Sequence, residues 1–312
     1  AELIILNKLA EQMRLKRMQA GAISFEKLET KFSLDEVGNP IEIYFKESKA
    51  AHKLIEEFML LANRKVAEFI GKQSLPFVYR VHDEPDPDKL KTFSEFLKKF
   101  GYGLQTSNRK KIATSMNQVL ADVHGKEEAN MIETLAIRTM AKASYTTENI
   151  GHYGLAFTHY SHFTSPIRRY PDVIVHRLLQ HYLNKGKAPD KEIIEQLCKH
   201  ASQQEIKATK AERESIKYMQ AKYMSERVGI NFEGIISGVT DFGMFVEVTN
   251  TGCEGLIKMR DIPGDYYFFD EDNYCLEGTN RGKIYQLGDI VKVKVRKVDI
   301  SKKEIDLTLL SY

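Results

Sequence analysis

The chain has 312 residues, enough to bury the core of one large domain or of two smaller ones. Its 46 lysines and arginines nearly balance 43 aspartates and glutamates, so a surface that binds a polyanion must be a local basic patch. Three cysteines without a close pair argue against a disulfide framework and a structural zinc and predict a cytoplasmic protein, and no apolar run is long enough to span a membrane.

The first two thirds of the chain predict mostly helices. Leu3, Leu6 and Leu9 recur at helical spacing, which predicts an amphipathic helix that ends at Gly21. Because this helix is already under way at Ala1, we expect a piece of a longer protein. A strand pair is expected within 22–45 around the turn DEVGNP, and further helices at 48–71, 88–100, 109–124, 127–143, 172–184 and 190–226.

The sequence changes character after Arg227. Valine, isoleucine, glycine and phenylalanine now alternate in short runs separated by turn residues, which predicts five strands in a small closed barrel. We therefore expect an α+β protein with a mostly helical domain over 1–226 and a β-barrel domain over 227–312.

The barrel segment carries a motif. GINFEGIISGVTDFGMFVEV, followed by EGLIKM and VKVRKVDISKKEIDLTLL, resembles the S-one-type RNA-binding domain, a five-stranded OB-fold. The resemblance implies that Phe242 and Phe245 stack on bases and that Lys258, Asp299 and Lys303 contact RNA. In the alternative interpretation, the two phenylalanines fill the barrel interior, and Asp299 and Lys303 form a solvated turn.

A second motif lies in the helical part. HYGLAFTHYSHFTSPIRRYPDVIVHRLL, residues 152–179, resembles the signature block of the ribonuclease II/ribonuclease R (RNB) family of exoribonucleases. Further stretches match the same family in the same order: GAISFE at 21–26, LIEEFMLLANRKVAEF at 54–69, PFVYRVHDEPDPDKL at 76–90 and AERES at 211–215.

The arginine pair of this block fits phosphate chemistry. Ser165-Pro166 is expected to start a helix, so Arg168 and Arg169 lie near a helix N-terminus, where a guanidinium beside free N–H groups receives phosphate well. The resemblance implies that Arg168 acts at the scissile phosphate and that Arg169 is its basic neighbour. The alternative is that the pair holds carboxylates such as Asp172.

The other matching stretches imply contacts to the end of the RNA. By resemblance, Glu57, or else Glu56 beside it, contacts the 3′-terminal nucleotide, Phe25 stacks on terminal bases, and Glu212 contacts a nucleotide. The alternatives are solvated glutamates on a helix, a core phenylalanine, and a salt bridge of Glu212 to Arg213 or a lysine.

No metal site is expected within the chain. The family resembles two-metal nucleases that hold Mg²⁺ with clustered aspartates, and the resemblance implies that these ligands lie upstream of Ala1. The one dense acidic run, HDEPDPDKL, is interrupted by prolines and aligns with a non-catalytic loop. Four histidines surround the signature without zinc-site spacing, and we interpret them as hydrogen-bonding and packing residues: His152, His159, His162 and His176.

The resemblance therefore implies a magnesium-dependent, hydrolytic 3′→5′ exoribonuclease. It is expected to act processively on the 3′ ends of single-stranded RNA, to release nucleoside 5′-monophosphates, and to be a cytoplasmic monomer. This chain alone is expected to be inactive. The alternatives are an RNA-binding module without catalysis and a phosphorolytic exoribonuclease, in which SPIRRYPD has no place.

Overall fold

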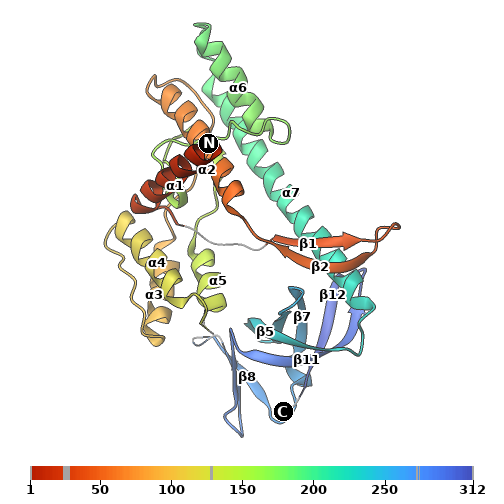
Figure 1. Cartoon of the computed structure of the whole chain (residues 1–312). Helices are drawn as coiled ribbons and strands as arrows, with labels where there is room; N and C mark the ends of the chain where they lie inside the picture. The colour runs from red at the N-terminus through yellow and green to blue at the C-terminus, as the bar shows by residue number, and fades with distance from the viewer. Residues whose placement is uncertain (1, 24–28, 127–128, 272, 274, 311–312) are drawn as a thin grey trace. The chain divides into compact units, whose positions relative to one another are not determined.

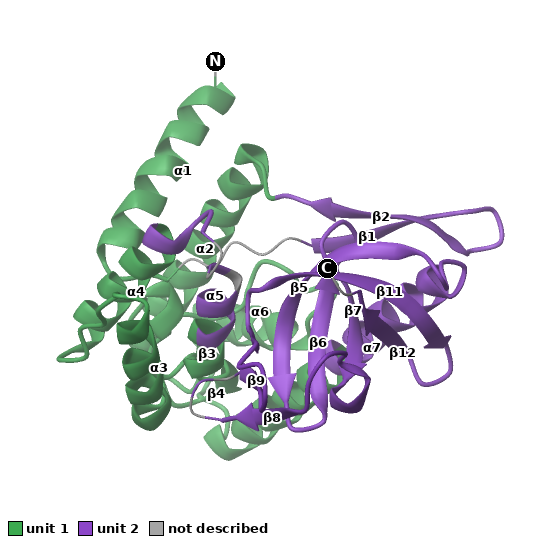
Figure 2. Ribbon diagram, turned by 90° about the horizontal axis from the view of Figure 1, so that it is seen from below, with its two compact units in different colours: residues 1–26, 48–121, 136–208 green, residues 27–47, 122–135, 209–312 purple. Residues whose placement is uncertain are grey.

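The computed structural model describes residues 2–23, 29–126, 129–271, 273 and 275–310. Phe25, which is predicted to stack on terminal bases, therefore lies outside the described residues. The chain forms two compact units, one of residues 1–26, 48–121 and 136–208 and one of residues 27–47, 122–135 and 209–312 (Figure 2). The domain boundary near residue 227 stays a prediction.

The first unit is mostly helical. The long apolar face of residues 50–71 forms a helix as its periodicity predicts, and its Ala67 and Ile70 pack in a core with Phe77, Val175 and Cys198. The helices that lie wholly or partly in this unit are α1 (Glu2–Gln19), α2 (Ala50–Gly71), α3 (Pro87–Lys99), α4 (Arg109–Val123), α5 (Ala129–Thr139), α6 (Tyr170–Leu183) and α7 (Lys191–Ser225) (Figure 1). Two short strands, β3 (Tyr79–Val81) and β4 (Ser144–Thr146), pair antiparallel (Figure 2).

The leucines of α1 do not form its packing face. Leu3, Leu6 and Leu9 are exposed, although the helix itself forms as expected. Instead the helix presents a face with the buried Ala10 and with Arg17, whose guanidinium contacts α2. Burial thus follows the position of the partner helix and not the leucine spacing. Among the described helices, none is long and apolar enough to cross a membrane.

The second unit contains a closed five-stranded barrel. Valines and isoleucines alternate with outward polar residues along its strands, so one face of each strand fills the interior. A parallel pairing of Asp306 with Leu256 completes the ring. The strands, in barrel order, are β11 (Ile290–Asp299), β12 (Glu304–Leu309), β7 (Cys253–Lys258), β6 (Gly243–Val248) and β5 (Asn231–Thr240); Figure 2 labels all of them.

Two smaller sheets belong to the same unit. The expected hairpin forms from β1 (Glu29–Leu34) and β2 (Pro40–Lys46). The segment GDYYFFDEDNYCLEGTNRGK after β7 is an aromatic insertion for which no strand was predicted. With the residues that follow it, the aromatic insertion forms a three-stranded antiparallel sheet of β8 (Tyr267–Asp270), β9 (Cys275–Gly278) and β10 (Ile284–Gln286).

Candidate nucleic-acid interface

The two arginines of the SPIRRYPD turn have different environments. The N–H groups of Arg168 and Arg169 both donate to the Ser165 carbonyl, so a turn precedes the helix. Arg169 is the N-cap of α6, and its Nη2 donates to Asp172 Oδ1 at 2.8 Å. Arg168 is exposed, and its side chain makes no hydrogen bond or ion pair with any residue that the structure describes. The alternative role, holding a carboxylate, therefore belongs to Arg169, while the Arg168 guanidinium is free to meet an anion.

The start of α6 differs from the expectation. The helix begins at Tyr170, with Pro171 in its first turn, rather than at Ser165-Pro166. The reason is Asp172, which is fully buried and whose Oδ1 also accepts a hydrogen bond from the Ser165 backbone N–H at 2.7 Å. This carboxylate fixes the turn beside the helix start, where a negative charge is favoured.

Asn63 of α2 holds the segment that leads into the turn. Its Nδ2 donates to the Tyr160 hydroxyl at 3.2 Å, and its Oδ1 accepts from the backbone N–H of Phe163 at 2.9 Å and of Thr164 at 3.2 Å. Sequence reasoning missed this residue. The available signal was an amide on an otherwise apolar helical face, because a buried amide must find partners.

A cavity of about 560 Å³ opens between α2 and this turn. The exposed Glu56 and the half-buried Arg169 both line it. Three buried polar atoms in this region have no hydrogen-bond partner among the residues that the structure describes: Thr164 Oγ1, Arg169 Nε and Asp172 Oδ2. The structure thus brings together two of the predicted site residues, Glu56 and Arg169, in a partly polar pocket.

Glu57 points elsewhere. It is buried rather than on the solvated edge of α2, and it forms an ion pair with Arg17 of α1. Both residues line a separate cavity of about 280 Å³ together with Arg64 and Phe157. Its contact with a nucleotide stays a prediction. Glu212 is exposed on α7 and makes no hydrogen bond or ion pair with the described residues.

Histidines and tyrosines form a buried network behind the signature. The His82 and His152 rings stack with centroids 5.0 Å apart, and His162 Nδ1 lies 2.7 Å from the Tyr145 hydroxyl. Burial lowers the pKa of His152 to about 3, with further effects from His82 and Arg80. Burial also lowers the pKa of His162 to about 2, assisted by Arg169 and Arg80. These imidazoles are therefore neutral, consistent with the packing role expected of them.

This network predicts a pH-dependent stability. The unfolded chain takes up protons on these histidines below about pH 6.5, whereas the folded chain does not until near pH 3, so the stability falls as the pH drops through this window. Between about pH 8 and about pH 5 each such histidine should cost about 2 kcal/mol. Denaturant unfolding at both pH values should show this loss.

The matching variant is His162→Gln. It should reduce the difference between the two pH values by about 2 kcal/mol, while His124→Gln, a change at an exposed histidine, should leave the difference unaltered. An equal pH dependence in His162→Gln and the unaltered chain would show that His162 is not held neutral by burial.

The barrel presents two phenylalanines outward. Phe242 is 52% exposed, and its ring meets Phe245 edge to face with centroids 5.9 Å apart. Gly238 pairs with Phe245 across β5 and β6, and a Cβ at Gly238 would lie 3.3 Å from the Phe245 ring. Gly238 therefore leaves room for a ring lying across the outer surface of the strand. The alternative that both rings fill the barrel does not hold in this structure.

The polar barrel residues expected to contact RNA already have partners in the structure. Lys258 Nζ donates to Asp306 Oδ2 at 3.1 Å, and Lys258 pairs across the strands with Gly243, which lies between Phe242 and Phe245 in the sequence. Asp299 Oδ1 accepts hydrogen bonds from the Ser301 hydroxyl and the Lys302 backbone in the turn after β11. Lys303 forms an ion pair with Glu214. RNA contacts by Lys258, Asp299 and Lys303 stay predictions. Each contact would replace a hydrogen bond or ion pair that the residue makes in the structure.

Carboxylates of the acidic run before α3 accept hydrogen bonds from neighbouring backbone N–H groups. Asp86 is the N-cap of α3, where its Oδ1 accepts from the backbone N–H of Asp88 at 2.9 Å, and Asp83 accepts from Glu84. Within the described ranges, no three His, Cys, Asp or Glu side chains gather to hold a metal ion. The described residues thus do not fit a two-magnesium centre, and no chemical step is assigned to a metal here.

Comparison with known proteins decides the family. The model of the RNB domain matches residues 1–185, and that of the S1 RNA binding domain matches residues 226–310. The chain belongs to the RNB family. Its α+β fold with a terminal five-stranded OB-fold barrel is confirmed, as is the resemblance of both motifs.

Several similar proteins are ribonucleases R. That of Aquifex aeolicus is 41% identical over 299 residues, which cover 95% of this chain and 42% of the relative. That of Escherichia coli K12 is 35% identical, with 98% and 39% covered. The apo form of Mycoplasma genitalium RNase R superposes with a TM-score of 0.92 at 30% identity, covering 99% of this chain and 49% of that one. The chain thus spans less than half the length of these relatives.

Proposed function

We propose that this chain is part of a hydrolytic 3′→5′ exoribonuclease of the ribonuclease R type. The enzyme would act processively on single-stranded RNA in the cytoplasm as a monomer and release nucleoside 5′-monophosphates. The observation that carries the proposal is the unpaired Arg168 guanidinium on a turn fixed by buried Asp172. The relatives support it: a solved neighbour at 29% identity is a Mycoplasma genitalium RNase R in complex with ribose methylated single-stranded RNA.

The residues take distinct roles in this proposal. Arg168 holds the scissile phosphate and matches the charge that develops as the bond breaks, since a preorganised donor acts most strongly in the transition state. Arg169, tied to Asp172, keeps the turn in place. Glu56, which is exposed at the 560 Å³ cavity, is the carboxylate more accessible to the sugar hydroxyls of a terminal nucleotide than Glu57, which pairs with Arg17.

The barrel supplies affinity for the strand. Outward aromatic rings stack on bases irrespective of sequence, and the nearby Lys258 is within reach of a phosphate. The proposed reaction requires magnesium, which would be bound by residues other than those that the structure describes. Binding of RNA without cleavage is the second candidate function, and the observation that favours it is the missing carboxylate cluster among the described residues. A phosphorolytic enzyme is disfavoured by the RNB assignment.

The chain alone should bind single-stranded RNA without shortening it. A 3′→5′ hydrolase of this kind needs bound magnesium to activate water, and the described carboxylates do not gather to hold it. The test is incubation with a 5′-labelled oligoribonucleotide and Mg²⁺, followed by gel analysis. Stepwise shortening by the purified chain would show that it carries a complete active centre.

A further inference from the structure

The insertion between β7 and β11 forms a platform that hydrogen bonds close onto itself. Asp265 accepts hydrogen bonds from the backbone N–H of Asn280 and of Arg281, at 2.9 and 2.6 Å to Oδ2, which closes the loop after β9 onto the segment before β8. Gly278 permits this closure, because a Cβ there would lie 2.8 Å from Asp265 Oδ2. The Arg281 side chain takes no part in it, and it makes no hydrogen bond or ion pair with the described residues.

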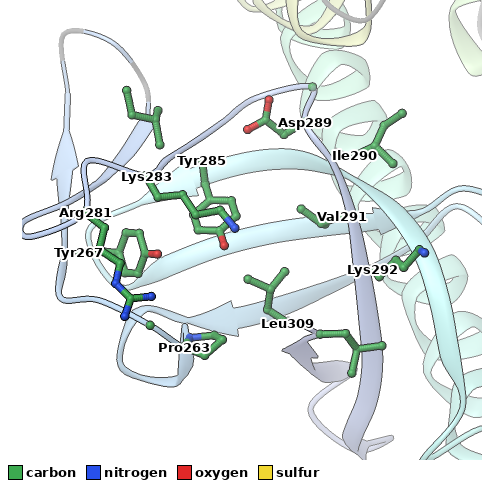
Figure 3. A pocket seen from close by; sticks show the side chains of 14 residues that line it. Pro263, Tyr267, Arg281, Lys283, Tyr285, Asp289, Ile290, Val291, Lys292 and Leu309 are labelled. Atoms are coloured by element: carbon green, nitrogen blue, oxygen red, sulfur yellow. The ribbon is translucent and has the colours of Figure 1, made fainter. Parts of the chain in front are cut away.

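A pocket of about 540 Å³ lies between this platform and the start of β11 (Figure 3). The rings of Tyr267 and Tyr285 form one side, with centroids 5.5 Å apart, and Val291 with Leu309 adds an apolar surface. Its volume lies within the roughly 300–1,000 Å³ that is typical of small-molecule binding sites.

Cations surround the pocket. Arg281, Lys283 and Lys292 line it and are exposed, and Lys283 Nζ lies 4.9 Å from the centre of the Tyr285 ring. The lining carboxylate, Asp289, already accepts a hydrogen bond from the Gln286 backbone at 2.9 Å. The balance of charge therefore favours an anion.

The basic surface continues along β11. Lys292, Lys294 and Arg296 are exposed and alternate with buried valines, so all three project from the outer face of the barrel. Arg296 also pairs with Asp261 at 2.7 Å. In the barrel order β11 is separated from β6, which carries Phe245, by β5 on one side and by β12 and β7 on the other. The pocket is thus distinct from the Phe242–Phe245 surface.

We propose that this pocket binds one nucleotide of a single-stranded RNA, with the base against Tyr267 and the neighbouring phosphates on Arg281 and Lys283. Aromatic and apolar walls accept the face of any base, and the cations complement the backbone. The inference rests on the proposed RNA-binding function and adds a second contact point on the same unit. A strand that reaches both places gains affinity over one that occupies only the phenylalanine surface.

The test compares variants of the whole chain in RNA binding over a range of salt concentrations. Arg281→Ala with Lys283→Ala should lower the salt slope of log affinity by about 1.4, at about 0.7 for each lost phosphate contact, and the affinity itself on the order of tenfold. The matched control, Lys91→Ala with Lys98→Ala, removes two exposed cations of α3 and should leave the slope unaltered. Tyr267→Leu should weaken binding without changing the slope.

The outcomes separate this inference from the function on which it rests. If the unaltered chain does not bind RNA, the proposed function fails and the inference with it. If the unaltered chain binds and Phe242→Ala weakens it, but the pocket pair behaves as the α3 control does, only the inference is overturned. Photocrosslinking of the unaltered chain to a 4-thiouridine oligonucleotide needs no variant: a crosslink within residues 263–292 is expected, and crosslinks confined to the phenylalanine surface would contradict the pocket.

Discussion

Replacing Arg168 with alanine is expected to lower the rate of RNA cleavage by on the order of 10²-fold or more, the scale for loss of one preorganised donor. The rate should be measured in a protein in which the segment carrying the aspartates expected of the family precedes this chain. The guanidinium is exposed and unpaired with the described residues, so its removal leaves no buried charge behind. The loss should therefore fall on the rate and not on the stability of the fold.

Two further substitutions test the assignment. Arg168→Lys keeps the charge but loses the two-pronged fork that matches a phosphate, so it should not restore the full rate. Arg169→Ala should reduce the rate less and the stability more, because it deprives the fully buried Asp172 of its 2.8 Å partner.

Single-turnover cleavage and RNA affinity should be measured separately for each of these variants. An interaction made mainly in the transition state affects turnover more than substrate binding. Near-normal turnover in Arg168→Ala, or a defect seen wholly as weaker binding, would mean that Arg168 does not act at the scissile phosphate.

Arg17→Ala is expected to destabilise the fold by about 3–5 kcal/mol, the cost of leaving one partner of a buried ion pair uncompensated. The side chains of Arg17 and Glu57 are only 9% and 5% exposed, so Arg17→Ala leaves a largely buried carboxylate without its guanidinium partner. Denaturant unfolding followed by circular dichroism measures the effect.

A double variant and a surface pair serve as controls. Arg17→Met with Glu57→Gln removes both charges and should be much closer to neutral than Arg17→Ala. Lys191→Ala breaks an ion pair whose partners are 51% and 70% exposed, and should cost at most about 1 kcal/mol. If Arg17→Ala costs no more than Lys191→Ala, the pair is not a structural element and Glu57 is available for the nucleotide contact that the sequence suggested.

Local patterns predicted much of this fold. The periodic apolar residues of 48–71 became α2 within two residues, and the alternating runs after Arg227 became the five barrel strands. Both motifs are contiguous in sequence, so the family could also be predicted from them. The predicted start of α6 was wrong, because the buried carboxylate of Asp172, and not Ser165-Pro166, sets the first turn.

The rest depends on residues that meet only in the fold. An amide on the apolar face of α2 signals that Asn63 needs partners. The sequence does not identify them as Tyr160, Phe163 and Thr164, which lie about one hundred positions away. Likewise Glu57 and its neighbour Glu56 look alike in sequence, but α1 covers one and leaves the other exposed. The aromatic insertion lacks an alternating pattern, and its sheet depends on a hydrogen-bonded loop closed by Asp265.

The claim that the barrel surface with Phe242 and Phe245 binds RNA is tested most directly by measuring the equilibrium affinity of the chain for single-stranded RNA with and without these two rings. Phe242→Ala with Phe245→Ala should weaken binding by roughly 1–3 kcal/mol for each lost stack. Phe69→Ala, which removes an exposed ring from α2, should leave it unaltered. Unchanged affinity in the double variant, with the barrel still folded by circular dichroism, would contradict the claim that this surface binds RNA.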